Sequence, residues 1–264
     1  MTDAVSAPMR EIIAAAYRVF GNYRLQSRLT VCMCNVCVSV EDELALRTTP
    51  LKEVSERLLM QYTDSAHGYG GDEFLHFVPR YFELVAEGYE PSGAGLEVCF
   101  RRLGEAECRQ QLKPEEAALA DSFFERLHHD LRDKIDYGDW PIGRVAENIL
   151  EYVVMVAIAG GDLERILRDW DRDERPTATL HLASVVRRIG FEHLHERAAF
   201  WPWSDYAPDD EQRYQQWLER SQTRERIEQM ALATSHPDEL VTLERAMDIL
   251  NDLRAARDME PGPH

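Results

Sequence analysis

Lysine is nearly absent from this chain, and positive charge as a whole is outnumbered. The only lysines are Lys52, Lys113 and Lys134, and 48 acidic residues against 30 Lys and Arg give a formal net charge of −18. A surface with this excess repels nucleic-acid phosphates and anionic membranes. We therefore expect neither a nucleic acid nor a membrane as a partner, and a basic protein suits the charge better.

The acidic residues are concentrated in two stretches of the chain. Residues 31–100 hold 12 Asp and Glu against 4 Lys and Arg, and residues 205–264 hold 14 against 7. These two stretches carry most of the negative charge. If the chain binds a basic partner, residues 41–90 and 209–260 are the predicted contact surfaces.

Long apolar runs are also missing. The longest, residues 152–159, is far shorter than the roughly 20 residues that a membrane-spanning helix requires. Residues 1–10 are polar and lack the apolar core of a signal peptide. We therefore expect a cytoplasmic protein in which the five cysteines are reduced thiols.

The chain has no alternating apolar and polar segment long enough to predict a sheet, and residues 31–40 are the only plausible strand. Helical spacing dominates instead. We predict an all-α fold of stacked antiparallel helix pairs, arranged as a compact bundle or a solenoid-like array. A main helical domain over residues 1–204 and a C-terminal acidic helical hairpin over residues 205–264, packed on it, are expected.

Three helix boundaries follow from local signals. Ser39 with Asp42 resembles a capping box and predicts a helix start. Thr49 and Pro50 predict the start of the next helix, because proline is tolerated at the first helical position. The C-terminal hairpin is predicted to consist of two polar helices over about residues 208–233 and 237–258.

Catalytic signatures are absent as well. The chain has no glycine-rich phosphate loop, no Gly-x-Ser-x-Gly nucleophile elbow and no kinase motif. Asp169, Asp171 and Asp173 match the opening of a calcium loop, but position six is Glu174 instead of Gly and position twelve is Leu180 instead of Glu. The three aspartates therefore indicate a solvated acidic loop.

Cys32, Cys34 and Cys37 form the most distinctive cluster of chemically reactive residues in the chain. Thiolates are soft donors, and closely spaced ones can chelate a single zinc ion or an iron–sulfur cluster. Three donors do not complete a tetrahedron, and candidates for the fourth are His67, Cys99 and Cys108. The alternatives are three inert, half-buried thiols or a redox-sensing site.

The helix predicted around Pro79 carries a polar stripe opposite its aromatic one. Its members lie three or four residues apart and are Asp72, His76, Arg80 and Glu83. The row could act as an acid/base site, because histidine titrates near neutrality. The favoured interpretation is an ion-pair network that pins neighbouring helices.

Two further groups are candidate contacts for a protein partner. Glu41, Asp42 and Glu43 form an acidic helix start, and Trp201 and Trp203 flank a proline in an aromatic turn. Exposed tryptophans often anchor partners. The turn could equally fill a gap between helix ends.

The Cys-rich start, the Thr49-Pro50-Leu51 turn and the segment GDEFLHFVPRYFEL resemble a group of uncharacterised bacterial helical proteins. These share a Cys-x-x-Cys-like start and a helix of the pattern DFxHFLPRxxEL, which corresponds here to residues 72–84. The resemblance covers about residues 10–103, and Val78 replaces the usual leucine. It implies a helical fold and no particular activity.

Three hypotheses follow for function. The first is a non-catalytic protein-binding module, in its sharpest version an immunity- or antitoxin-like protein, that blocks a basic toxin-like partner and needs no cofactor. The second is a metal-binding or redox-responsive regulator that uses Cys32, Cys34 and Cys37, with zinc as the metal. The third is an enzyme with an acid/base site centred on His76.

Overall fold

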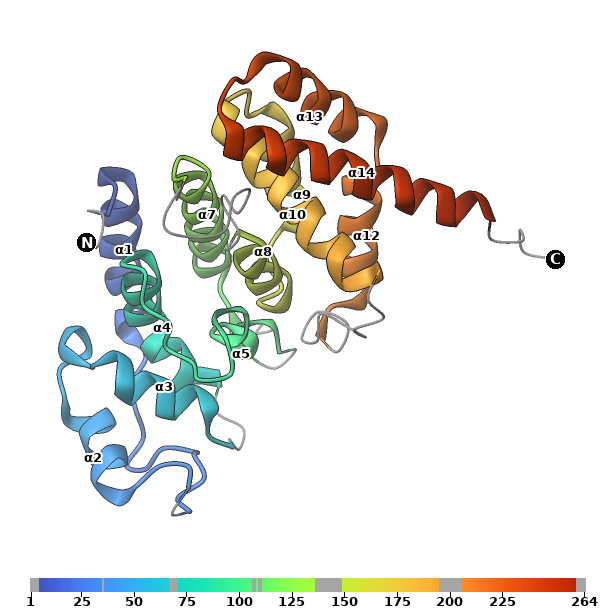
Figure 1. The fold of residues 1–264 in the computed structure, drawn as a ribbon. Coiled ribbons are helices and arrows are strands. Elements are labelled where there is room, and N and C mark those ends of the chain that lie inside the picture. The colour runs from blue at the N-terminus through green and yellow to red at the C-terminus, as the bar shows by residue number, and fades with distance from the viewer. Residues whose placement is uncertain are drawn as a thin grey trace. The chain divides into compact units, whose positions relative to one another are not determined.

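The computed structural model describes residues 5–34, 36–66, 71–105, 108, 111–135, 149–194 and 206–259 (Figure 1). Within these ranges the regular elements are all helices, which confirms the all-α prediction. No helix of the described ranges is both long enough and apolar enough to cross a bilayer. Residues 31–40 are the only plausible strand in the sequence, but the described part of this segment is a loop that leads into a helix.

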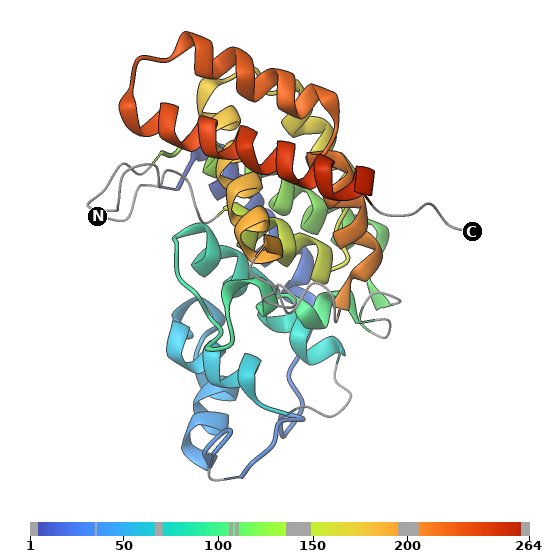
Figure 2. The ribbon, with the colours of Figure 1, turned by 45° about the vertical axis from the view of Figure 1, so that its right-hand side comes forward.

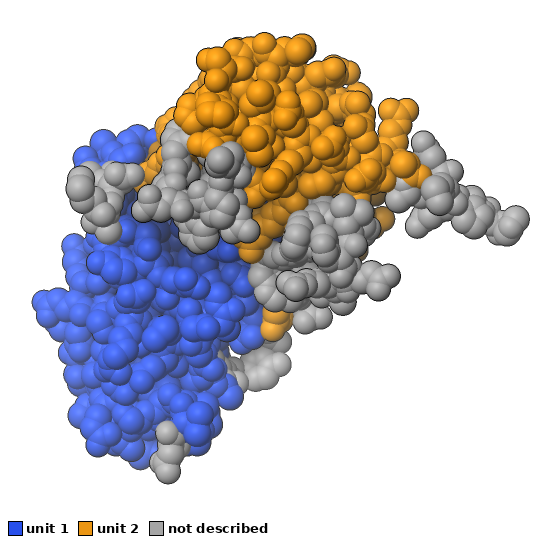
Figure 3. Space-filling model, in the orientation of Figure 1, with its two compact units in different colours: residues 1–127, 151–162 blue, residues 128–150, 163–264 orange. Residues whose placement is uncertain are grey.

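The chain forms two compact units, residues 1–127 with 151–162 and residues 128–150 with 163–264 (Figure 3). The expected division between residues 204 and 205 lies outside the described residues and stays a prediction. The first unit contains α-helices and single 3₁₀ turns (η). They are α1 (Ala7–Val19), η1 (Phe20–Asn22), α2 (Val40–Thr48), η2 (Leu51–Glu53), α3 (Glu56–Asp64), α4 (Gly71–Ala86), η3 (Leu96–Val98) and α5 (Arg101–Gly104). Two more helices, α7 (Pro114–Leu131) and α8 (Ile149–Ile158), have residues in both units.

Serine side chains cap the first three α-helices of this unit, α1, α2 and α3. Ser39 accepts a hydrogen bond from the Asp42 amide at 3.0 Å and caps α2, as its spacing predicts. The predicted helix start at Thr49 and Pro50 is wrong, because these residues lead only into η2. Ser55 caps α3 instead, accepting from the Leu58 amide at 3.3 Å.

Aromatic rings fill the core of the first unit. Phe82 of α4 stacks on Phe123 of α7 with ring centroids 3.9 Å apart and 2° between the planes. The edges of Phe20 and Phe124 meet the same ring at 6.5 Å and 6.3 Å, and Phe100 lies at 5.6 Å. These contacts join η1, which directly follows α1, to α4, α7 and the segment before α5.

The second unit contains α9 (Leu163–Arg172), α10 (Pro176–Leu194), α12 (Pro208–Leu218), α13 (Ser221–Ala233) and α14 (Pro237–Met259). The single predicted helix over 208–233 is wrong, since the chain breaks between α12 and α13. The carbonyl of Trp217 accepts from Arg220 Nε at 3.0 Å and Thr223 Oγ1 at 3.1 Å, and so side chains satisfy the end of α12. In both views α13 and α14 run side by side, and both pack against α10 (Figures 1 and 2).

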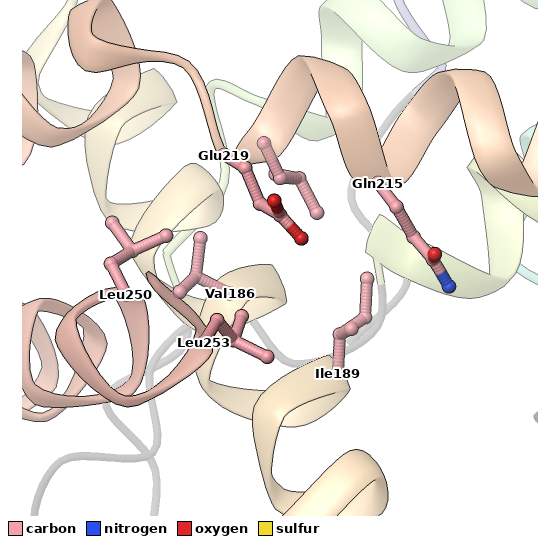
Figure 4. Close-up of a pocket in the computed structure, with 7 residues that line it drawn as sticks. Val186, Ile189, Gln215, Glu219, Leu250 and Leu253 are labelled. Carbon is pink, nitrogen blue, oxygen red and sulfur yellow. The ribbon is translucent and has the colours of Figure 1, made fainter. Parts of the chain in front are cut away.

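An apolar pocket lies between α10, α12 and α14 of the second unit (Figure 4). Its lining is mainly aliphatic, with one amide and one carboxylate. The lining residues are Val186, Ile189, Gln215, Leu218, Glu219, Leu250 and Leu253. Such a lining offers no cluster of catalytic or metal-binding groups.

His128 is buried in the second unit against the ring of Trp170, with centroids 4.8 Å apart. Among the described residues neither of its ring nitrogens has a hydrogen-bond partner. Burial, helped by the charge of Arg132, holds the pKa of His128 well below its ordinary value. The imidazole is therefore neutral in the folded protein at neutral pH.

Because His128 is buried in its neutral form, the free energy of unfolding falls in acid. Below a pH of about 6.5 the unfolded chain binds a proton at His128 that the folded chain does not, so the free energy of unfolding decreases as the pH falls from there. We expect His128→Leu to flatten this decrease and to raise stability at pH 5, measured by urea denaturation across pH. His236→Leu at an exposed histidine is the control. An unchanged pH profile in His128→Leu would contradict the assignment.

Candidate functional site

The sulfur atoms of Cys32, Cys34 and Cys37 all lie within 4.8 Å of one another. All three cysteines are free thiols, with Cys34 exposed and the other two half-buried. The segment between Val31 and α2 thus turns back on itself and brings three soft donors to one point. The loop can hold a metal ion, because the ligands are already gathered and one of them faces solvent.

Two buried carboxylates fix the chain just before the cysteines. Glu43 of α2 accepts a hydrogen bond from the Leu29 amide at 2.9 Å, and Glu73 of α4 accepts one from the Thr30 amide at 2.9 Å. Both glutamates are about 5% exposed. Burial raises the pKa of the Glu73 carboxyl, while the Thr30 amide counteracts this. The residues that begin the loop are therefore hydrogen-bonded to side chains of α2 and α4.

Backbone hydrogen bonds fix the loop itself. The Cys32 amide donates to the Ala66 carbonyl at 2.7 Å, and the Val38 amide donates to the Cys32 carbonyl at 3.2 Å. Val31 and Val38 are buried on either side of the cysteines. The loop is anchored at both ends, and its cysteines are held in place by the fold.

The three thiols differ in acidity. Hydrogen bonds to the sulfur of Cys34, first from the Val36 amide and then from Cys32 and Cys37, lower the pKa of Cys34 to about 7. The pKa of Cys37 is raised, first because its thiol hydrogen-bonds to Cys34. Cys34 is therefore a thiolate in a large fraction of molecules at neutral pH, and thiolates are the form that binds metal.

The three candidates for a fourth ligand are not equivalent. Cys99 and Cys108 are both buried and do not belong to the group of close sulfur atoms. Burial raises the pKa of the Cys99 thiol, which keeps it protonated. His67 lies outside the described residues. No other His, Cys, Asp or Glu of the described chain joins the group.

The structure separates the three acidic residues that were expected to contact a partner. Glu41 is exposed, whereas Asp42 forms an ion pair with Arg57 at 2.7 Å. Glu43 is buried, where it pairs with Arg47 at 2.7 Å and anchors the cysteine loop. Glu43 is therefore not positioned to contact a partner. Trp201 and Trp203, the other predicted contacts, lie outside the described residues.

The polar stripe of α4 connects this helix to its neighbours. Glu83 Oε2 accepts hydrogen bonds from Tyr17 of α1 at 2.6 Å and from Arg80 at 2.5 Å, and Arg80 Nε donates to the Val54 carbonyl at 2.8 Å. His76 Nδ1 lies 3.0 Å from the Tyr23 carbonyl, and Asp72 is exposed. This is the geometry of a network that pins helices.

Burial lowers the pKa of His76, while its bond to Tyr23 opposes this. An imidazole hydrogen bonded to a backbone carbonyl must carry its proton on that nitrogen, so Nδ1 is the donor and the lone pair is on Nε2. His76, Arg80 and Glu83 make hydrogen bonds within the fold, whereas Asp72 is exposed. An acid/base role for His76 stays a prediction.

Exposed apolar side chains occur within the cysteine loop and in the helix that follows it. Among the described residues seven large hydrophobic side chains are exposed, and four of these lie between residues 33 and 44. Val36 is 92% and Val40 68% exposed, and the others are Met33 and Leu44. Sequence reasoning missed this feature and Glu73, because a single valine or glutamate carries no signal of its exposure.

No protein-family model, curated protein or solved structure matches the chain. The resemblance to bacterial helical proteins therefore stays a prediction, and function is argued from the site alone.

Proposed function

We propose that the protein is a metal-binding regulator that takes up a thiophilic metal ion at Cys32, Cys34 and Cys37. The observation that carries this proposal is the grouping of the three sulfur atoms within 4.8 Å. Thiols that serve only to fill a core have no reason to converge in a half-exposed loop. A ligand set of soft donors selects zinc and similar ions over magnesium or calcium.

The regulatory part of the proposal rests on the position of the loop. A metal ion would fix the residues between Cys32 and Cys37, and these include Met33 and Val36, two exposed apolar side chains. Metal uptake would thus change the surface that the loop offers to other proteins. No catalytic group is needed for this function.

Zinc content gives the direct test. We expect protein purified under reducing conditions to contain about one metal ion per chain, and Cys37→Ser to lose it, because one of three close ligands is removed. Metal would be measured by plasma mass spectrometry, and stability by urea denaturation with and without a chelator. Cys99→Ala, which removes a buried thiol outside the group, is the matched control. Metal-free wild-type protein with a stability that the chelator does not change would refute the proposal.

The second candidate function is a protein-binding module, which could be immunity- or antitoxin-like and block a basic partner. The four exposed apolar side chains between residues 33 and 44 favour it, because clustered exposed apolar side chains mark interaction sites and these four are close in sequence. Glu41, an exposed acidic residue, lies next to Val40 in sequence. If such a partner is isolated, Glu41→Lys is expected to slow association and Val40→Ser to speed dissociation, measured by surface plasmon resonance.

A further inference from the structure

We infer that the cysteine loop is a three-coordinate, all-sulfur site for the soft monovalent ion Cu(I). This rests on the proposed function and names the ion that the same site prefers. Within the described residues the group contains three sulfur atoms and no oxygen or nitrogen ligand. Carboxylate and imidazole ligands serve harder or borderline ions, whereas an all-thiolate set suits the soft ion Cu(I) as well as zinc, so the number of ligands has to distinguish these two ions.

The number of ligands also distinguishes the ions. Structural zinc sites have four protein ligands in a tetrahedron, and a site with three leaves one position to water. Cu(I) is a filled-shell soft ion that forms complete complexes with two or three thiolates. The grouping of Cys32, Cys34 and Cys37 therefore satisfies Cu(I) fully and zinc only in part.

Backbone hydrogen bonds hold the three sulfur atoms in position. The Cys32 amide donates to the Ala66 carbonyl at 2.7 Å, and the Val38 amide donates to the Cys32 carbonyl at 3.2 Å. Contacts behind the ligands orient them toward a metal ion.

Access to the site is through Cys34. This residue is exposed, whereas Cys32 and Cys37 are half-buried, so an ion approaches from one side. The apolar side chains of Met33 (44% exposed) and Val36 flank Cys34 in sequence. An open-faced site of this kind can exchange its ion with an incoming thiol ligand: a new sulfur–copper bond forms, one protein sulfur–copper bond breaks, and the oxidation state of copper is unchanged.

The test is a competition under anaerobic, reducing conditions with the full chain. Cu(I) is supplied as its complex with bathocuproine disulfonate, and its loss from that chelator is followed by absorbance. We expect one Cu(I) per chain to be withdrawn. In Cys34→Ser the affinity should fall by more than the roughly 10–100-fold that loss of an outer-sphere partner costs. Cys99→Ala should bind as the wild type does.

X-ray absorption at the copper edge of the wild-type complex supplies a readout that does not depend on any variant folding. Three sulfur ligands are expected, and a nitrogen ligand that disappears in His67→Ala would overturn the three-coordinate site. If the chelator keeps all the copper while zinc binds stoichiometrically, the Cu(I) inference is wrong and the proposed function stands. If neither ion binds, both are wrong.

Discussion

Replacing Arg132 by methionine is expected to lower the free energy of unfolding by about 3–5 kcal/mol. The Arg132 side chain is fully buried, and it pairs with Asp169 and with Asp173, whose Oδ2 lies 3.3 Å from Arg132 Nε. Burial raises the pKa of Asp173, but hydrogen bonding to Arg175 and the charge of Arg132 outweigh it and hold that pKa at about 2. Methionine fills the space of the stem and leaves the buried Asp173 charge without one of its two partners.

Urea denaturation of the whole chain measures this loss. Arg168→Met is the matched control, because Arg168 lies in the same unit and pairs with Glu164 at 3.2 Å, but both side chains are more than half exposed. A surface pair of this kind is worth about 0–1 kcal/mol. If both variants lose the same small amount, the Arg132 cluster does not stabilise the unit in the way described. Replacing Arg132, Asp169 and Asp173 together by apolar residues should restore part of the loss, since no buried charge then remains unpaired.

The Arg132 cluster also shows what the sequence could not predict. Asp169, Asp171 and Asp173 are typical of a solvated acidic loop when read alone, yet Asp173 is 8% exposed and pairs with Arg132. That arginine comes from a point 37 residues before Asp169. Charge pairing over such a separation depends on tertiary packing, and no local pattern encodes it. The sequence interpretation of a solvated acidic loop is therefore wrong: Asp169 and Asp171 belong to helix α9, and the Asp173 side chain is buried.

Local patterns predicted the fold class well. Helical spacing indicated an all-α chain, and Ser39 indicated the start of α2, because both depend on residues within a few positions of one another. The start of α3 and the break between α12 and α13 were missed. At the break, the side chains of Arg220 and Thr223 both donate hydrogen bonds to the Trp217 carbonyl. The sequence alone does not show which donors a carbonyl accepts from.

Of the candidate site, only the three cysteines could be predicted from the sequence. The spacing of Cys32, Cys34 and Cys37 indicated a chelating group, and the structure brings the three sulfur atoms together. The supports of the loop were not predictable. The sequence places Glu43 in an acidic surface and gives no signal at Glu73. In the structure, both side chains accept backbone hydrogen bonds from the residues just before the cysteines. A buried carboxylate and an exposed one look the same in a sequence.

Replacing Phe82 by alanine is expected to lower the free energy of unfolding by about 3–5 kcal/mol, as much as the Arg132 substitution. The Phe82 ring is fully buried and stacks on Phe123, while Phe20, Phe100 and Phe124 surround it. Alanine leaves a cavity at the point where α1, α4 and α7 meet, and the surrounding rings cannot close it without moving their helices. Denaturation by urea, followed by far-UV circular dichroism, measures the loss.

A graded series distinguishes loss of volume from loss of ring contacts. Phe82→Leu keeps most of the apolar volume and loses mainly the aromatic pairs, each worth about 0.5–1.5 kcal/mol, so it should be less destabilising than alanine. Val40→Ala, at a side chain that is 68% exposed in the same unit, should stay within about 0.5 kcal/mol of the wild type. Equal stability of Phe82→Ala and Val40→Ala would mean that the aromatic cluster is not the core of this unit. The cysteine loop is anchored on α4 through Glu73, so loss of this core should also weaken the metal binding that we propose for the loop, as the unit unfolds.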